Sequence, residues 1–476
     1  MHTPRYIFVS GGVISGIGKG VCAASLALLL KKRGFKVTSL KCENYLNIDS
    51  GTINPIEHGD PFLCDDGLEA DMDLGTYERF LGTNMGHKNF TTMGQIYKTV
   101  IDRERSMGYG GEDVEAIPHV ADEIISRIKK VGEENEIVVV ELGGTVGEYQ
   151  NMLYYEACRI MKVTMPNNVI NVHVSYMPLP KHLGEPKTKP TQMSVSTLMS
   201  MGIHPEFLVL RGEVGLDERR RYILGLRTSI PGPNVIVAPD VETIYDVPLL
   251  FAEQEFDTKV LHHFGLFPKK IDLSDWEKLV KRIKSKKSRK IKVAIAGKYL
   301  SKHKGDFQLV DVYHSLVEAI KHAGWHLGVD VDIKYVSTLL IEDEGTEMLK
   351  GMDAIIVPIG WGARGAEGKI AAITYARKNK IPYLGLCYGM QLACVEFARN
   401  VCGLDADTEE NNPQVKDPVI HSIPFNEKYQ VIKGEGVSMR LGAYDCVIKK
   451  GTLAESWYTK YGGWKKKGIV SERHRH

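Results

Sequence analysis

The chain has 476 residues, a formal net charge of +2, 43% hydrophobic residues and 25% charged residues. This length is more than one hydrophobic core normally serves, so two or three domains are expected, and the small net charge is unlike that of strongly basic nucleic-acid-binding domains. The sequence has no secretory signal and no run of about 18 uncharged apolar residues that would span a membrane. Its eight cysteines form no C-x-x-C pair, which favours a reducing, cytoplasmic location and argues against disulfides and structural zinc.

An apolar strand, a glycine-rich turn and a helix are predicted at the start of the chain. Residues 6–12 form the strand, residues 21–30 form the helix, and the turn between them contains Ser15-Gly16-Ile17-Gly18-Lys19-Gly20. Such a turn places backbone N–H groups and a lysine around a phosphate. It departs from the usual P-loop pattern because Val13 stands at the first glycine position and Gly20 replaces the magnesium-binding Ser/Thr. A bound nucleotide would therefore need carboxylates from elsewhere to hold its metal; the alternative is a tightly packed turn without a ligand.

Three charged residues further along the chain are candidates for the same site. Lys41 ends a predicted strand at residues 36–41, at the edge where parallel sheets bind ligands. Asp73 belongs to an acidic stretch, and Glu141 directly follows the apolar run 137–140, which reads as a buried parallel strand. Carboxylates in these places are plausible magnesium ligands, whereas the alternative for each is a solvated charge.

A second anion site is predicted between residues 184 and 192. Lys187 and Lys189 lie beside hydroxyl and amide side chains, and Pro186 and Pro190 stiffen the backbone around them. This combination is typical of a preorganised site for a polyanion. Further strands are predicted at residues 207–211 and 235–240.

The composition changes between residues 268 and 291, where lysine and arginine dominate around one short amphipathic helix. We interpret this stretch as an interdomain linker between a first domain at residues 1–267 and a second at residues 292–476. Both halves alternate strands and helices, which predicts an α/β fold with mostly parallel sheets.

The second domain contains a candidate nucleophile. Gly385-Leu386-Cys387-Tyr388-Gly389 follows a predicted strand and resembles a nucleophile elbow. We expect the helix N-terminus to lower the pKa of the Cys387 thiol, and the backbone N–H groups of Gly360 and Tyr388 to form an oxyanion hole. The alternative for a cysteine is an inert core residue.

Taken in order, these motifs resemble the CTP synthase family over the whole chain. The motifs that carry the resemblance are Gly18-Lys19-Gly20, Asp71-Met72-Asp73, Glu141-Leu142-Gly143-Gly144, Lys187-Thr188-Lys189, Gly385-Leu386-Cys387-Tyr388-Gly389 and Glu472-Arg473-His474-Arg475-His476. The resemblance implies two doubly wound domains, a P-loop amidoligase like dethiobiotin synthetase and a flavodoxin-like class I glutamine amidotransferase. It also implies that ATP phosphorylates the 4-oxygen of UTP and that ammonia from glutamine then gives CTP.

The resemblance further implies roles for individual residues. ATP would be bound by Ser15, Gly16, Ile17, Gly18, Lys19, Gly20, Arg211, Asp240 and Val241. UTP and the inhibitor CTP would be bound by Ser15, Lys187, Thr188, Lys189, Gln192, Arg221, Glu148 and Gln150. Glutamine would be bound by Gly360, Tyr388, Gln391 and Glu409, with Cys387, Lys19 and Lys41 as catalytic residues, Asp73 and Glu141 as Mg²⁺ ligands, and His58 at the ammonia gate. GTP as an activator and a homotetramer are implied as well.

The family's glutaminase triad is completed by a His-Pro-Glu segment beyond the last motif. The histidines that follow Cys387 in these 476 residues are His421, His474 and His476, and none precedes Pro-Glu. A cysteine without such a base lacks its usual activation. We expect a further C-terminal segment, and we expect the 476 residues by themselves to use ammonia better than glutamine; the alternative is a protein that cannot hydrolyse glutamine.

Two other functions fit parts of the sequence. A P-loop ATPase switch with a fused interaction domain would explain the Lys19 turn but not Lys187-Thr188-Lys189. An inactive paralogue that serves only in assembly would keep the fold without the chemistry.

Overall fold

The computed structural model describes residues 3–180, 182, 184–301, 310–423 and 439–476. The chain forms two compact units: unit 1 comprises Met1–Ser50 and Asp73–Lys284, and unit 2 comprises Gly51–Met72 and Ser285–His476. Within the described ranges, none of the helices combines the length and apolar character needed to cross a bilayer. The domain limits expected at residues 267 and 291 rest on composition and stay a prediction.

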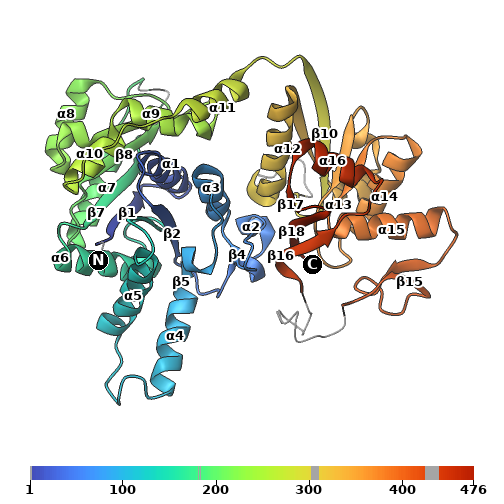
Figure 1. The fold of residues 1–476 in the computed structure, drawn as a ribbon, viewed down its shortest axis with the longest axis horizontal. Coiled ribbons are helices and arrows are strands. Elements are labelled where there is room, and N and C mark those ends of the chain that lie inside the picture. The colour runs from blue at the N-terminus through green and yellow to red at the C-terminus, as the bar shows by residue number, and fades with distance from the viewer. Residues whose placement is uncertain (1–2, 181, 183, 302–309, 424–438) are drawn as a thin grey trace. The chain divides into compact units, whose positions relative to one another are not determined.

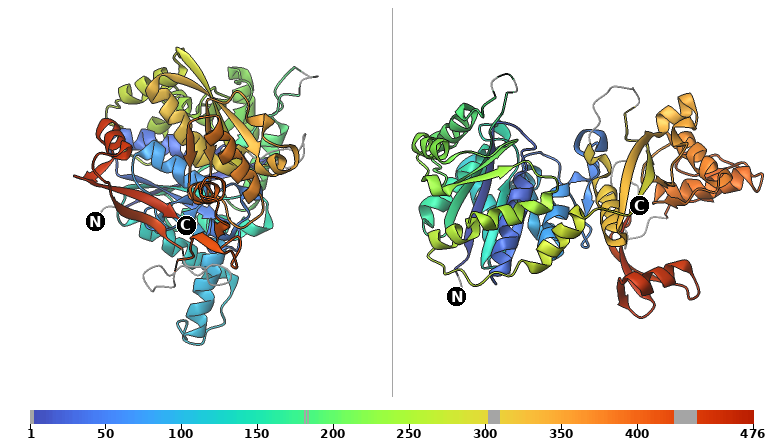
Figure 2. Two further views of the ribbon diagram at one scale, coloured as in Figure 1. Left: turned by 90° about the vertical axis from the view of Figure 1, so that its right-hand side faces the viewer. Right: turned by 90° about the horizontal axis from the view of Figure 1, so that it is seen from above.

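Unit 1 is built on one parallel sheet of seven strands in the order β5-β2-β6-β1-β7-β8-β9 (Figures 1 and 2). The strands are β1 (Arg5–Gly12), β2 (Val37–Glu43), β5 (Phe90–Thr92), β6 (Ile137–Leu142), β7 (Val169–Tyr176), β8 (Phe207–Gly212) and β9 (Val235–Pro239). β1, β6 and β7 are almost entirely buried, as is usual for the central strands of a parallel sheet. β7 also buries the polar side chains of Asn171, His173 and Ser175. Because all seven strands run in parallel, their carboxyl ends share one edge of the sheet, where ligands bind in such folds.

The helices of unit 1 pack on the sheet and on one another. They are α1 (Lys19–Lys32), α3 (Met72–Leu81), α4 (Met93–Arg105), α5 (Ala121–Gly132), α6 (Met152–Thr164), α7 (Lys189–Ser200), α8 (Glu218–Thr228), α9 (Val247–Glu253), α10 (Phe256–His263) and α11 (Ser274–Lys284). Tyr6 and Phe8 of β1 belong to a core cluster with residues of α4, α5 and α6.

Helix α11, the short helix of the predicted linker, is docked on unit 1. Its Trp276 packs against Phe80 and Tyr245, with ring centroids 5.1 and 5.7 Å away, and its indole N–H donates to the Tyr245 carbonyl oxygen at 2.8 Å. The apolar face that the sequence indicates for this helix is therefore buried, whereas the basic residues that follow it lie outside unit 1.

Unit 2 contains a parallel sheet in the order β11-β10-β12-β13 and a smaller antiparallel sheet in the order β16-β18-β17 (Figure 1). Its strands are β3 (Phe62–Leu63), β4 (Glu69–Ala70), β10 (Arg289–Gly297), β11 (Val329–Ser337), β12 (Ala354–Val357), β13 (Tyr383–Gly385), β14 (Ala406–Thr408), β15 (Asp417–Ile420), β16 (Leu441–Val447), β17 (Trp464–Lys466) and β18 (Ile469–Arg475). Its helices are α2 (Pro55–His58), α12 (His314–Leu327), α13 (Thr338–Glu344), α14 (Ala366–Lys378), α15 (Tyr388–Asn400) and α16 (Leu453–Tyr461). The predicted α/β fold with mostly parallel sheets is confirmed in both units.

Candidate functional site

The loop between β1 and α1 has the backbone of a phosphate-binding turn. Gly16 and Gly18 have φ values of 70° and 86°, and Gly18 is the N-cap of α1. Val13, which stands where a glycine is usual, also has a positive φ of 80°, a conformation that β-branched residues rarely adopt. The loop therefore keeps a glycine-like backbone at Val13 at the expense of local strain. The free N–H groups at the start of α1 are suitable donors to a phosphate.

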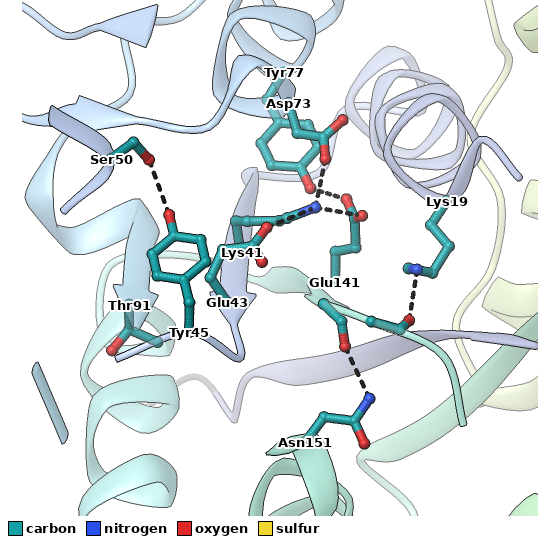
Figure 3. A network of polar contacts seen from close by, with 12 residues as sticks. Lys19, Lys41, Glu43, Tyr45, Ser50, Asp73, Tyr77, Thr91, Glu141 and Asn151 are labelled. Carbon is teal, nitrogen blue, oxygen red and sulfur yellow. Dashed lines mark hydrogen bonds and ion pairs between the residues drawn. The ribbon is translucent and has the colours of Figure 1, made fainter. Parts of the chain in front are cut away.

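Lys19 is folded back over this loop and is buried. Its Nζ donates to the Gly144 carbonyl oxygen at 2.7 Å (Figure 3). A Cβ at Gly11 would lie 2.5 Å from the Lys19 Cδ, so glycine is required there for the lysine to pass. Burial lowers the pKa of Lys19. An ammonium group held against a neutral carbonyl is suited to an additional anionic ligand, such as a phosphate oxygen.

Lys41, at the carboxyl end of β2, is the centre of a buried ion cluster (Figure 3). Its Nζ lies 2.8 Å from Glu141 Oε1 and 3.2 Å from Glu43 Oε1, and it also contacts Asp73 Oδ2. The phenol of Tyr77 donates to the second oxygen of Glu141. Burial, followed by the neighbouring Asp73 carboxylate, raises the pKa of Glu141. The three charged residues selected from the sequence, Lys41, Asp73 and Glu141, are thus brought together.

Gly20 is explained by Asp73. A Cβ at position 20 would lie 2.1 Å from Asp73 Oδ1 and 2.7 Å from its Cγ. The Asp73 carboxylate therefore occupies the space where the side chain of the usual P-loop Ser/Thr would begin. An oxygen ligand from α3 stands in for the missing hydroxyl next to the Lys19 turn.

The Asp73 and Glu141 carboxylates fit a magnesium ion bound together with a nucleotide. Mg²⁺ is usually held by one or two carboxylates plus phosphate oxygens and water, rather than by a cage made entirely of protein. Among the residues that the structure describes, no group of three or more His, Cys, Asp or Glu side chains is arranged as such a cage. Two carboxylates beside a phosphate-binding turn therefore fit an ion that phosphate oxygens would also hold.

Three residues assigned to ATP by the resemblance also lie near this turn. Arg211, in β8, donates to the Ile17 carbonyl oxygen at 3.2 Å and to the Ala238 carbonyl oxygen at 2.7 Å. Its Nη2 lies 3.0 Å from Asp240 Oδ1, and Val241 is the next residue. Arg211 therefore ties the phosphate loop to the loop after β9.

The predicted polyanion site forms a cavity of about 240 Å³ between the start of α7 and α8. The residues that line it are Glu185, Pro186, Lys187, Thr188, Lys189, Gln192, Arg220, Ile223 and Arg227. Gln192 donates to Thr188 Oγ1 at 3.1 Å, and Lys187 pairs with Glu185. Four cations against one carboxylate give this cavity the charge that a triphosphate requires.

Four residues that the resemblance assigns to UTP or CTP binding do not line that cavity. Arg221 does not line it, whereas two other arginines of α8, Arg220 and Arg227, do and supply cations. Ser15 and Gln150 are exposed. Glu148 accepts from the Thr145 N–H at 2.9 Å, which fixes the loop after β6.

Cys387 forms the expected elbow between β13 and α15. Its φ of 50° and ψ of −105° are unusual for a residue with a side chain, as a sharp strand-to-helix turn requires. The expectation of a lowered thiol pKa was wrong: burial raises the pKa of Cys387 to about 11, and this outweighs the opposite effects of the Tyr388 N–H, Lys369 and Arg475. The thiol lies 3.5 Å from the Arg475 carbonyl oxygen. Among the described residues, no histidine hydrogen-bonds to the thiol.

Of the other residues predicted to bind the substrate glutamine, some lie next to this elbow and others lie on neighbouring loops. Tyr388 begins α15, and the Gln391 N–H donates to the Cys387 carbonyl oxygen at 3.0 Å. Gly360, in the loop after β12, lies against Tyr388, since a Cβ there would be 3.2 Å from the Tyr388 ring. Glu409 follows β14 and is engaged with His421 Nδ1 at 2.7 Å. His58, assigned to the ammonia gate, is exposed at the end of α2 in unit 2.

The sequence reasoning missed several residues of these sites. Glu43 and Tyr77 join the Lys41 cluster, and Lys298 and Lys369 lie under the loop that contains Gly360. Glu43 could have been predicted from the sequence, because Glu43 and Lys41 are two residues apart in β2 and such residues share a face of the strand. Lys369 gave no signal, since it reads as an ordinary charged residue of a helix.

Comparisons with known proteins agree with this architecture. A family model described as CTP synthase N-terminus matches residues 5–266, and one described as glutamine amidotransferase class-I matches residues 308–475. The CTP synthase of Pyrococcus furiosus is 46% identical over 474 residues, which are 99% of this chain and 85% of that protein. The CTP synthases of Wolinella succinogenes and Halalkalibacterium halodurans are each 43% identical, over 99% and 100% of this chain and 85% and 87% of their own lengths.

Proposed function

Because the chain belongs to the CTP synthase family, a family of ligases that aminate UTP to CTP with glutamine, we propose that its own residues divide the reaction between the two units. Unit 1 carries the ATP-dependent step at Lys19, Lys41, Asp73 and Glu141. Unit 2 carries glutamine hydrolysis at Cys387. The observation that carries the proposal is the buried cluster around Lys41, in which a lysine and carboxylates meet beside a phosphate-binding turn.

In the first step, the uracil 4-oxygen of UTP attacks the γ-phosphorus of ATP and ADP leaves. Ammonia then adds to carbon 4 of the uracil ring, which carries the phosphorylated oxygen. Phosphate leaves with that oxygen, and loss of the extra proton gives CTP. Such phosphoryl transfer depends on positioning and on charge stabilisation rather than on covalent help from the protein. Lys19 and Lys41 supply two buried positive charges for this purpose, and Lys41 is held in place by its carboxylate partners.

Asp73 and Glu141 would hold Mg²⁺, whose chemistry is to neutralise charge on the phosphate oxygens. The close approach of Asp73 to Gly20 supports this assignment, because it delivers an oxygen ligand where the turn lacks its own.

The nucleotides would occupy separate places in unit 1. The turn from Ser15 to Gly20 and the loop with Arg211, Asp240 and Val241 would bind ATP. The cavity with Lys187, Lys189 and Gln192 would bind the UTP triphosphate, with Arg220 and Arg227 as additional cations. CTP inhibition, GTP activation, a homotetramer and a cytoplasmic location extend this proposal from the family.

Ammonia is proposed to be the better nitrogen source for these 476 residues. A thiol with a pKa near 11 is almost entirely protonated at neutral pH, and the thiolate is the nucleophile. Unit 1 does not depend on the thiol, so added ammonia bypasses it.

The test compares CTP formation from UTP and ATP with ammonia and with glutamine. Lys19→Ala is expected to abolish CTP formation with both nitrogen sources, whereas Cys387→Ser is expected to abolish only the glutamine-dependent reaction. Equal turnover with glutamine and ammonia would contradict the account of the thiol.

ATP hydrolysis that needs no UTP, together with no protection of the fold by UTP against heating, would favour a P-loop ATPase switch instead. A folded chain without CTP formation from any nitrogen source would favour an inactive paralogue.

A further inference from the structure

Two buried lysines hold the backbone carbonyl groups of the loop that follows β12. Lys369, in α14, donates to the Pro358 carbonyl oxygen at 2.7 Å and to the Ile359 carbonyl oxygen at 3.0 Å. Lys298, directly after β10, donates in the same way to the carbonyl oxygens of Trp361 and Gly362. The exposed fractions of Lys369 and Lys298 are 0% and 2%. Between the two pairs of held carbonyls lies Gly360.

The direction of a carbonyl group determines the direction of the following N–H group. In a trans peptide these two groups point to opposite sides of one rigid plane. The loop contains an example: the Trp361 carbonyl points to Lys298, and the N–H of Gly362 donates on the other side to Glu410 Oε1 at 2.6 Å. By the same rule, the Ile359 carbonyl on Lys369 turns the N–H of Gly360 away from that lysine. Among the described residues this N–H has no hydrogen-bond partner.

Lys369 also contacts the other side of the elbow. Its Nζ lies 4.9 Å from the centroid of the Tyr388 ring, and Tyr388 is the residue after Cys387. A Cβ at Gly360 would be 2.9 Å from the Lys369 Nζ, so the backbone of the loop packs directly on the ammonium. The Lys369 side chain therefore contacts both the loop that contains Gly360 and the start of α15, and it fixes the position of one against the other.

We propose that Lys369 is a positioning residue of the glutaminase site, which fixes the Ile359–Gly360 peptide so that the Gly360 N–H faces the reacting amide. This inference rests on the proposed hydrolysis of glutamine by Cys387. When the Cys387 Sγ bonds to the amide carbon, the electron pair of the C=O bond moves to the oxygen, and the Gly360 N–H donates to that oxyanion. The thiol proton ends on the nitrogen that leaves as ammonia, and water releases glutamate from the thioester. A flipped peptide would present a carbonyl oxygen to the oxyanion instead.

The test uses the aldehyde analogue of glutamine, in which hydrogen replaces the amide nitrogen. Its carbonyl carbon bonds to the thiol sulfur and the thiol proton moves to the oxygen, so affinity reports the oxyanion site without a leaving group. Lys369→Met is expected to weaken this affinity about tenfold or more, in line with the loss of one oxyanion donor. Lys369 also lowers the pKa of the thiol, so alkylation of Cys387 by iodoacetamide, followed by mass spectrometry, is compared as the limiting rate of the thiolate fitted from a pH–rate profile. That limiting rate is expected to stay within about twofold, because the reaction forms no oxyanion.

Matched variants separate positioning from simple loss of a buried charge. Lys298→Met removes a similarly buried lysine that orients the Trp361–Gly362 peptide, whose N–H already donates to Glu410. This variant is expected to weaken binding of the aldehyde less than Lys369→Met does. Lys369→Gln keeps an N–H donor and is expected to retain more affinity than Lys369→Met. Thermal unfolding checks that unit 2 is folded in each variant, and ammonia-dependent CTP formation checks unit 1.

Equal affinity of the wild type and Lys369→Met for the aldehyde would overturn the positioning role alone. A parallel loss in the limiting alkylation rate of the thiolate would overturn it too, because the thiol itself would then be disturbed. A wild-type chain that does not bind the aldehyde would refute the glutaminase site and, with it, this inference.

Discussion

Lys41 in unit 1 and Lys369 in unit 2 are both buried, but their ammonium groups have different kinds of partner. Lys41 contacts the carboxylates of Glu43, Asp73 and Glu141. Lys369 contacts two neutral carbonyl oxygens and an aromatic ring. Burial and the nearby Lys298 lower the pKa of Lys369 to about 7.

This difference separates two ways of building a site. In the proposed function, the unit 1 cluster would act through charge, so that its chemistry would depend on which ionised groups are present. The unit 2 site would act through the direction of backbone N–H groups, so that it would depend on how a loop is held. The comparison predicts that losing a charge is most damaging in unit 1, whereas small changes in geometry are most damaging in unit 2.

The largest effect is expected from Lys41→Met. The buried carboxylates of Glu43 and Glu141 and the half-buried carboxylate of Asp73 lose their shared cation. This should lower the free energy of unfolding by about 3–5 kcal/mol and reduce ammonia-dependent CTP formation by about 10³-fold or more. Thermal unfolding and a CTP assay measure the two effects. Lys98→Met, which removes a solvent-exposed pair with Asp102 at 2.7 Å, serves as the control and should cost at most about 1 kcal/mol.

Gly20→Ser tests whether Asp73 has taken the place of the P-loop hydroxyl. The new Cβ would lie 2.1 Å from Asp73 Oδ1, and displacing that carboxylate should reduce CTP formation by about 10²-fold. The double variant Gly20→Ser/Asp73→Gly should recover thermal stability because the clash is gone, while activity stays low because a carboxylate is missing. A fully active Gly20→Ser enzyme would show that Asp73 is not needed at this position.

A smaller effect is expected in the triphosphate cavity. Arg227→Gln removes a lining cation and should raise the KM for UTP about tenfold, the typical value of one hydrogen bond to a charged group. Arg221→Gln is the matched control on the same helix, and its side chain does not line the cavity. If the Arg221 variant shows the larger rise in KM, the arginine inferred from the sequence is the correct one.

The smallest effect concerns the pH dependence of unit 2. The pKa of Lys369 is about 7 in the folded chain and about 10.4 when unfolded. Above pH ~7 the unfolded chain holds a proton that the folded chain has lost, so the free energy of unfolding rises with pH. The Tm of unit 2 should increase by a few degrees between pH ~6.5 and pH ~8.5, and Lys369→Met should flatten this increase. Parallel curves for the two proteins would show that Lys369 titrates normally.

Much of the fold and part of the site follow from local sequence. Glu141 could be predicted because four apolar residues precede it, and such a run ends at the ligand edge of a parallel sheet. The elbow at Cys387 could be predicted because its flanking glycines permit a sharp turn. Gly20 indicated that a carboxylate had to come from elsewhere, and the structure places Asp73 against it.

The sequence by itself therefore determined the α/β fold, the glycine-rich turn before α1, the elbow at Cys387 and three members of the Lys41 cluster, namely Lys41, Asp73 and Glu141. Only the tertiary structure decided that Tyr77 joins Glu141, that Arg227 rather than Arg221 lines the cavity, and that Lys369 lies under the loop that contains Gly360. The physical reason is that turns and strand ends are encoded by neighbouring residues. The burial of a charged or titratable side chain, by contrast, depends on segments that meet only after folding. Burial of this kind raises the pKa of the Cys387 thiol, which the sequence had led us to expect to be lowered.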